Sequence, residues 1–446
     1  MTIEKLLEEK KIFDLSLRFE KVGVSDEDRE WSLPGNFVFL RLFLYFFRIS
    51  DNIPSAPSVP SHVSTLSSTA NLLHVSIERF EGDTSQGPLQ LLFATTADRR
   101  LHFLAPDSSF TLIKSMSHLQ DCPILACVAF GKGSIRTISS GMSGQTVLYD
   151  HKQDRVLDER RDHKKYIVKI ATCDEGHTTF VATAGWDGKV FLYQIRSGND
   201  LKLGEPVASI NIATNPESIT FVKHPDINRP ILVVTRRDST SLLYYSLPKA
   251  DAPSSENSLP MKMGLLGSQN LAPHSNAWIA FSPSSVAVSP TDPTLLAVAT
   301  SAVPHMKLII VRLLIPSSGP SSTAADGGPA TQAVQTRANL AAQDEEDAAI
   351  LVHVSTLAPQ TPYSTPQVVW RPDGSGVWVN GDDGVLRGLE AKTGRIVATL
   401  KEGHEMGSKI RSIWCGMVDV GGKQEEWVVS GGFDRRLVVW KPGKET

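Results

Sequence analysis

The feature that most constrains the fold is a unit of short strands that recurs every ~40 to 50 residues. Each unit has an apolar strand, a second strand ending in small residues, a turn, and a third strand rich in β-branched and aromatic residues. A more variable outer strand follows, and no convincing helical period interrupts the pattern between residues 71 and 440. The second and third strands of the successive units lie at residues 91–104, 134–149, 178–193, 230–247, 295–314, 375–389 and 426–440.

A repeat of this kind predicts an all-β fold, a seven-bladed β-propeller that occupies residues 61–442. The last unit ends at Trp440, which leaves too few residues for its own outer strand. Residues 62–68 precede the first unit, have an alternating pattern, and are free to supply that strand. Joining the two ends of the chain in one blade would close the ring and leave no unpaired edge. A ring with one blade fewer or more remains an alternative.

Two segments inside the propeller depart from the strand pattern. Residues 248–275 are rich in Pro, Ser and Ala, and residues 316–347 are rich in Ser, Gly, Ala and Pro before they end in the acidic run 344–347. Such compositions bury too little apolar surface to offset the entropy of ordering. We therefore predict two flexible surface loops, either tolerated insertions or carriers of modification sites and short binding motifs.

Composition excludes several functional classes. The chain has 41% hydrophobic and 21% charged residues and a formal net charge of −3, which is typical of a globular protein and gives no strong nucleic-acid signal. The four cysteines lack C-x-x-C spacing, so we expect buried free thiols and no metal site: Cys122, Cys127, Cys173 and Cys415. The charged N-terminus lacks the apolar core of a signal peptide, which predicts a cytoplasmic and/or nuclear protein.

Residues 1–36 differ in character from the repeats. Apolar residues at Ile3, Leu6, Leu7, Phe13 and Leu17 form a rough helical stripe in a charged background, and this predicts a short helical segment. Residues 37–60 then form an apolar stretch followed by a Ser/Pro-rich linker.

The apolar stretch, residues 37–49, contains two arginines and is shorter than the ~20 residues that a membrane-spanning helix needs. Three interpretations stay open: a non-native insertion from a mis-spliced gene, a segment that packs on the propeller or binds a partner, and an interfacial membrane contact. Membrane contact is the least favoured of the three.

Two units share a four-residue pattern in which a His precedes the inner strand, a hydroxyl lies four residues before an Asp, and an aromatic residue lies six residues after it. In the last unit the four residues are His404, Ser430, Asp434 and Trp440. In the third unit they are His163, Thr183, Asp187 and Tyr193. The second unit is partial: Ser139 and Tyr149 fit, Ser143 replaces the Asp, and His118 is the candidate for the loop position.

This pattern resembles that of the WD-repeat proteins. The resemblance implies that the Asp accepts a hydrogen bond from the His ring, that the His engages the hydroxyl, and that the hydroxyl reaches the Trp indole N–H. The same spacing recurs in two units, so we interpret the His–Asp–Ser set as structural and not as a catalytic triad. The N-terminal stripe resembles the LisH dimerisation module, with Phe19 one residue early for that pattern, and this implies a homodimer through the helix.

The chemistry of an enzyme is not evident in the sequence. No phosphate-binding loop, H-E-x-x-H motif or G-x-S-x-G motif is present. The expected inner strands, such as residues 127–130 and 368–370, are mostly apolar or small, which disfavours polar groups converging on the centre of the ring. We therefore expect no enzymatic activity, no cofactor and no catalytic residue.

Arginine pairs occupy three of the turns between second and third strands. Because these turns lie on one rim of a propeller, we predict that they form a partner-binding face: Arg99, Arg100, Arg236, Arg237, Arg435 and Arg436. The favoured function is a non-catalytic scaffold or adaptor that binds other proteins within a complex. One alternative is a substrate receptor of a cullin-type ubiquitin ligase, based on residues 147–152; another is a membrane-associated trafficking adaptor, based on residues 37–49.

Overall fold

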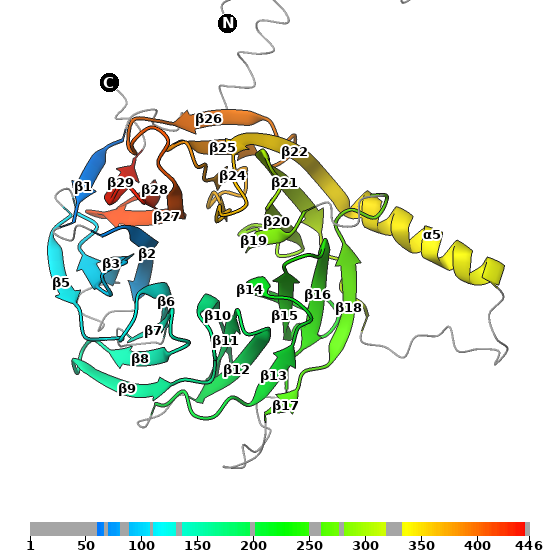
Figure 1. Cartoon of the computed structure of the whole chain (residues 1–446), viewed down its shortest axis with the longest axis horizontal. Coiled ribbons are helices and arrows are strands. Elements are labelled where there is room, and N and C mark those ends of the chain that lie inside the picture. Colours follow the sequence, from blue (N-terminus) through cyan, green and yellow to red (C-terminus); the bar gives the residue numbers. More distant parts are fainter. Residues whose placement is uncertain are drawn as a thin grey trace, which may run out of the picture. The chain divides into compact units, whose positions relative to one another are not determined.

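The computed structural model describes residues 60–66, 70–80, 89–107, 110–130, 136–196, 201–248, 260–275, 281–317 and 332–441. The strands of this part form seven sheets that follow one another around a ring, each with its first strand toward the centre (Figure 1). This confirms the all-β, seven-bladed propeller. The helical segment expected at residues 1–36 and the apolar stretch at 37–49 lie outside the described residues.

Six blades are built from strands in chain order. Blades 1 and 2 contain β2 (Leu72–Phe80), β3 (Leu89–Thr96), β4 (Leu101–Leu104), β5 (Leu112–Met116), β6 (Ile124–Phe130), β7 (Arg136–Gly141), β8 (Thr146–Asp150) and β9 (Arg155–Arg160). Blade 3 contains β10 (Ile167–Glu175), β11 (Thr178–Gly185), β12 (Lys189–Arg196) and β13 (Ala208–Asn211), and blade 4 contains β14 (Pro216–Lys223), β15 (Pro230–Arg236), β16 (Ser241–Ser246) and β18 (Leu265–Asn270). Blades 5 and 6 contain β19 (Pro283–Val288), β20 (Leu295–Thr300), β21 (His305–Arg312), β22 (Ile350–Pro359), β23 (Val368–Trp370), β24 (Gly376–Val379), β25 (Leu386–Glu390) and β26 (Ile396–Leu400).

Blade 7 joins the two ends of the propeller. Its first three strands are β27 (Ile410–Val420), β28 (Lys423–Gly432) and β29 (Arg436–Trp440), and its outer strand is β1 (His62–Thr65). β1 pairs antiparallel with β29, with His62 opposite Val439, as the sequence predicted. Lys441 reinforces this closure: its backbone N–H donates to Ser61 Oγ at 3.1 Å, and its ammonium lies 4.0 Å from the ring centroid of Trp427.

Both segments predicted as flexible loops contain regular structure in their C-terminal parts, and the prediction was wrong for those parts. Residues 248–275 include β17 (Met261–Lys262), which extends blade 3 in parallel with β13, and β18 of blade 4. Residues 316–347 run into helix α5 (Gln332–Ala349). Residues 249–259, 276–280 and 318–331 lie outside the described part.

The physical reasons for these two errors differ. An outer strand such as β18 is held by backbone hydrogen bonds to β16 and is solvated on its outer side, so it needs no apolar pattern. Most residues of helix α5 are Ala, Gln, Glu, Leu or Arg, which have high helix propensity but also occur in low-complexity sequence. The backbone hydrogen bonds of α5 form within the helix itself. In addition, the Glu346 side chain accepts a hydrogen bond from the Asn270 backbone N–H at 2.7 Å.

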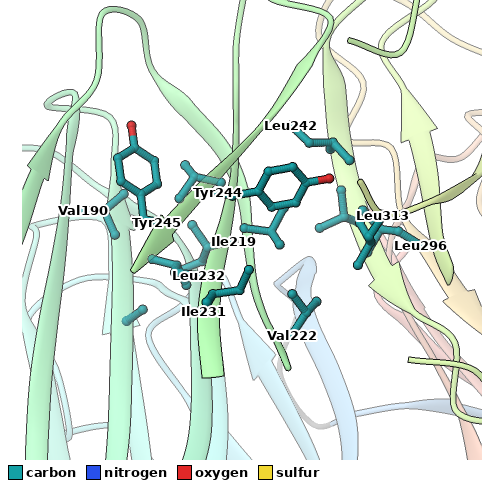
Figure 2. Packing of buried hydrophobic residues seen from close by; sticks show 14 of the residues in the cluster. Val190, Ile219, Val222, Ile231, Leu232, Leu242, Tyr244, Tyr245, Leu296 and Leu313 are labelled. Carbon is teal, nitrogen blue, oxygen red and sulfur yellow. The ribbon is translucent and has the colours of Figure 1, made fainter. Parts of the chain in front are cut away.

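The core of the propeller lies between neighbouring blades. One apolar cluster joins blades 3, 4 and 5, and its members include Val190 of blade 3, Ile219, Leu232 and Tyr244 of blade 4, and Leu296 of blade 5 (Figure 2). Within it, Tyr244 donates its hydroxyl to Gln269 Oε1 at 2.5 Å, so that the polar end of a buried ring is satisfied. Each blade is thus stabilised by both of its neighbours, and the ring stands as a rigid frame for its loops.

Candidate functional site

One face of the ring, which we call the turn face, carries the second-to-third-strand turns of all blades. Strands alternate in direction within a blade, so the connections that lead into each inner strand reach the same face. Loops held on a rigid scaffold are where propellers place their recognition residues. The three arginine pairs predicted from the sequence lie in or directly beside turns of this face.

The four residues of blade 7 form one connected hydrogen-bond network. His404 Nδ1 lies 3.0 Å from both carboxylate oxygens of Asp434, and its Nε2 lies 2.8 Å from Ser430 Oγ. The indole N–H of Trp440 donates to the same Ser430 Oγ at 3.3 Å. Asp434 also accepts the Glu405 backbone N–H at 2.9 Å, so the network ties the connection before β27 to the β28–β29 turn.

Blade 3 has a similar network, in which Tyr193 stands at the position of the tryptophan. His163 Nδ1 lies 3.0 Å from Asp187 Oδ1, and its Nε2 lies 2.9 Å from Thr183 Oγ1. Tyr193, which has no indole N–H, donates its hydroxyl to Asp162 Oδ2 at 2.9 Å. In both blades the network therefore joins three elements: the connection before the inner strand, the turn between the second and third strands, and the third strand.

In both networks the surroundings of the aspartate favour its ionised carboxylate. Burial by itself raises the pKa of Asp434, but the hydrogen bond and charge of His404 and two backbone N–H groups outweigh burial and hold the pKa below its ordinary value. Asp187 has a lowered pKa for the corresponding reasons, with His163 as the partner. In blade 7 the side chains of His404 and Asp434 are fully buried, and Ser430 is 0% exposed. The Ser430 hydroxyl oxygen thus has two hydrogen-bond partners inside the blade, the His404 ring and the Trp440 indole N–H.

The second blade uses a different residue from the one expected. Gln120, and not the exposed His118, is buried against Ser139 and donates its Nε2–H to Ser139 Oγ at 2.9 Å. Ser143, at the place of the Asp, donates to Asp121 Oδ1 at 3.0 Å. A glutamine side chain offers both a hydrogen-bond donor and an acceptor, so Gln120 can take the place of the histidine. The sequence pattern did not reveal it, because that pattern identifies only a histidine at this position.

The arginine pairs share the turn face but do not form one patch. Blades 1 and 7 are neighbours, whereas blade 4 lies across the ring (Figure 1). Most of these side chains are engaged within the chain: Arg99 with the Asp121 carbonyl, Arg100 with Asp98, Arg236 with Thr214, Arg237 with Glu217, and Arg436 with Glu405. The side chain of Arg435 is exposed at the tip of its turn. A role of all six in partner binding stays a prediction.

Exposed apolar side chains on the turn face of blades 5 to 7 were missed in the sequence. Met406 is 97% exposed, Tyr363 is 87% exposed, and Phe433 is 41% exposed. Hydrogen bonds join their loops: the Phe433 backbone N–H donates to the Lys409 carbonyl at 2.9 Å, and Lys409 Nζ donates to Thr361 Oγ1 at 3.0 Å. We call Tyr363, Met406 and Phe433 the apolar turn-face group. Isolated apolar residues in turns give no periodic signal, which is why the sequence pattern did not reveal them.

The motif behind the ubiquitin-ligase alternative is engaged in local structure. Asp150 is buried at the end of β8, lies 3.2 Å from Arg136 Nε, and accepts the backbone N–H groups of Lys152 and Gln153. Its carboxylate therefore stabilises the turn that follows the strand. For the trafficking alternative, the described part of the chain holds no helix long and apolar enough to cross a membrane.

Comparison with known proteins agrees with this architecture. The family model described as "UCP007778, beta-propeller domain" matches residues 69–441, which is nearly the whole ring. The chain belongs to this β-propeller family. The matched region begins just before β2 and ends after β29, so it contains the inner three strands of all seven blades. No curated protein matches the sequence of the chain.

Proposed function

We propose that this β-propeller is a WD-repeat type scaffold that binds other proteins on its turn face and has no catalytic activity of its own. The observation that carries the proposal is the apolar turn-face group, because large apolar side chains held outward on rigid loops are typical anchors of protein interfaces. The exposed Arg435 lies in the same turn as Phe433 and adds a charged group that interfaces favour.

The buried networks of blades 3 and 7 support the non-catalytic part of the proposal. Their histidines and hydroxyls have the residue types of a hydrolytic triad, but the hydroxyls are buried and hydrogen-bonded inside the blade. Such networks contribute to the rigidity of the loops that surround them. The WD-repeat assignment is supported by the shared geometry of the two networks.

The experiment compares partners captured by three forms of the full chain. The test variant carries Tyr363→Ala, Met406→Ala and Phe433→Ala, and the matched control carries Leu89→Ala, Ile113→Ala and Met417→Ala, which remove exposed apolar side chains elsewhere on the ring. We expect proteins captured from the native cells by the wild type and the control to be lost with the test variant. Capture of the same set by all three forms would refute binding through the turn face.

A fourth form, lacking residues 1–60, separates the propeller from the N-terminal segment. If it captures the same proteins as the full chain, recognition belongs to the propeller. If they are lost, the N-terminal segment is the binding element and the scaffold role of the ring is wrong. The oligomeric state of the same form, measured by light scattering, tests the predicted homodimer.

A further inference from the structure

A serine or threonine followed directly by proline occurs at four positions of the chain. They are Ser282, Ser289, Thr361 and Thr365. A proline has no backbone N–H and favours an extended conformation of the residue before it. Proline-directed protein kinases bind an extended substrate segment of this type, with the hydroxyl residue directly before the proline. The sequence alone does not distinguish between the four positions.

Burial separates these four positions. Ser282 and Ser289 are buried, and Thr365 is partly buried. Thr361 and the proline that follows it, Pro362, are both exposed, in the connection between β22 and β23 on the turn face. A kinase has to bring its own active site to the hydroxyl oxygen, so Thr361 is the accessible acceptor among the four.

A cationic side chain lies next to the Thr361 hydroxyl. Lys409 Nζ donates a hydrogen bond to Thr361 Oγ1 at 3.0 Å and also lies 3.0 Å from Asp382 Oδ2. Ser364, in the same loop as Thr361, donates its hydroxyl to Asp382 as well. A phosphate attached to Thr361 Oγ1 would therefore be placed within reach of an ammonium group, and charge-assisted hydrogen bonds of this kind are strong.

Lys409 also connects the loops of the apolar turn-face group. Its backbone carbonyl accepts the Phe433 N–H at 2.9 Å. Its side chain contacts Thr361, two residues before Tyr363, and Met406 lies in the same connection as Lys409 itself. A phosphate on Thr361 would thus engage the residue through which these loops are joined.

We propose that Thr361 is a phosphorylation site for a proline-directed protein kinase and that the phosphate, held by Lys409, prevents other proteins from binding to the apolar turn-face group. The effect on binding rests on the function proposed above. In the reaction, Thr361 Oγ1 forms a bond to the γ-phosphorus of ATP, the bond from that phosphorus to the bridging β,γ-oxygen breaks, and ADP leaves. The hydroxyl proton passes to a base of the kinase.

The charge of the phosphate accounts for the effect on binding. A phosphothreonine carries a charge of about −1.5 to −2 at pH 7. Lys409 supplies one positive charge, and Asp382 already lies 3.0 Å from it, so a net negative charge remains close to Tyr363. A partner that covers the apolar turn-face group would have to take this charge out of water, which is costly.

The first test is phosphorylation of the purified full chain by a mitogen-activated protein kinase, a proline-directed enzyme, with ATP and Mg²⁺. We expect mass spectrometry to find a phosphoryl group on Thr361 in the wild type and its loss in Thr361→Ala. Pro362→Ala keeps the hydroxyl but should lower the initial rate at Thr361 at least about tenfold. Thr393→Ala, at an exposed threonine followed by glycine, is the matched control and should be phosphorylated as the wild type is. An unmodified Thr361, or equal rates for the wild type and Pro362→Ala, would overturn the inference.

The second test asks whether Lys409 holds the phosphate. A nearby ammonium favours the doubly ionised phosphate, so the second pKa of the Thr361 phosphate should be lower in the wild type than in Lys409→Gln. A ³¹P NMR titration measures this pKa directly. Lys401→Gln, at an exposed lysine in the same connection between β26 and β27, is the matched control and should leave it unchanged. Equal pKa values in the wild type and Lys409→Gln would overturn the assignment of Lys409.

The third test compares proteins captured from the native cells by the phosphorylated and the unphosphorylated chain. We expect the proteins that depend on Tyr363, Met406 and Phe433 to be lost on phosphorylation, and to be retained by kinase-treated Thr361→Ala. Their capture by both forms would overturn the effect on binding and leave the proposed function intact. If alanine at all three apolar residues loses no protein, the proposed function fails and the effect on binding fails with it, whereas phosphorylation of Thr361 is decided by the mass spectrum alone.

Discussion

At the scale of single residues, burial determines what a His–Asp–Ser set does. His404, Asp434 and Ser430 have the distances of a catalytic triad, yet Ser430 Oγ also receives the Trp440 indole N–H inside the blade. A nucleophile needs an open approach, whereas these groups are completely enclosed. We therefore expect these groups to contribute to stability, because they satisfy one another's hydrogen bonds where water is excluded.

The blade 7 network leads to a stability prediction. His404→Ala and Asp434→Ala should each lower the free energy of unfolding by about 1–3 kcal/mol, because each leaves buried polar groups without partners. Urea denaturation measures the change, with the exposed His118→Ala as the control. The double variant should lose less than the sum of the two single losses, since both act on one network. Unchanged unfolding midpoints in both single variants would contradict a structural role.

At the scale of elements, the closure of the ring depends on β1, a strand of four residues far from its partner in sequence. Its pairing with β29 covers an edge that would otherwise be exposed. Leu66 follows it and is buried in the cluster between blades 7 and 1, so closure joins backbone hydrogen bonds with apolar packing. We therefore expect this short outer strand to be important for the stability of the ring.

Two truncations test this closure. A chain that begins at residue 61 keeps β1, and a chain that begins at residue 67 lacks both β1 and Leu66. We expect the shorter chain to unfold at lower temperature and to associate, because the edge of β29 is left unpaired. Differential scanning calorimetry and light scattering report the two effects. Identical melting and scattering of the two chains would show that β1 is dispensable.

At the scale of the whole molecule, we expect two partly buried groups on β2, His74 and Glu78, to give the free energy of unfolding opposite dependences on pH. Burial, aided by nearby cations, lowers the pKa of His74 from 6.5 to about 4, so between these values the unfolded chain binds more protons and stability falls on acidification. Burial raises the pKa of Glu78 from 4.5 to about 7, so in that window the folded chain binds more protons and stability falls as the pH rises.

Single substitutions should separate these two contributions. In His74→Gln, the free energy of unfolding should fall less steeply than in the wild type as the pH decreases from 6.5 to about 4. In Glu78→Gln it should fall more steeply over the part of this range above 4.5, because the opposing contribution is removed. Urea denaturation at several pH values measures both slopes. Parallel profiles for the wild type and both variants would exclude these groups as the source of the dependence.

Much of this architecture was predictable because it is local and repeated. The strand pattern predicted the blades, and a fixed spacing predicted the contacts of His404 with Asp434 and of His163 with Asp187. The same approach failed in three places. Strand β18 is mostly exposed and has no apolar alternation, and helix α5 has the composition of a low-complexity segment. In blade 2, Gln120 stands where the pattern expects a histidine.

What the sequence by itself determined is the repeating unit, and with it the ring, its closure by β1, and the networks within single blades. These depend on residues close in the chain or on strand pairing that the pattern requires. Only the tertiary structure decided which side chains meet across blades. The Val75 backbone N–H of β2 donates to Ser412 Oγ of β27 at 3.1 Å, between blades 1 and 7, although 337 positions separate the two residues in the chain. The curvature of the ring, which no local pattern encodes, brings them together.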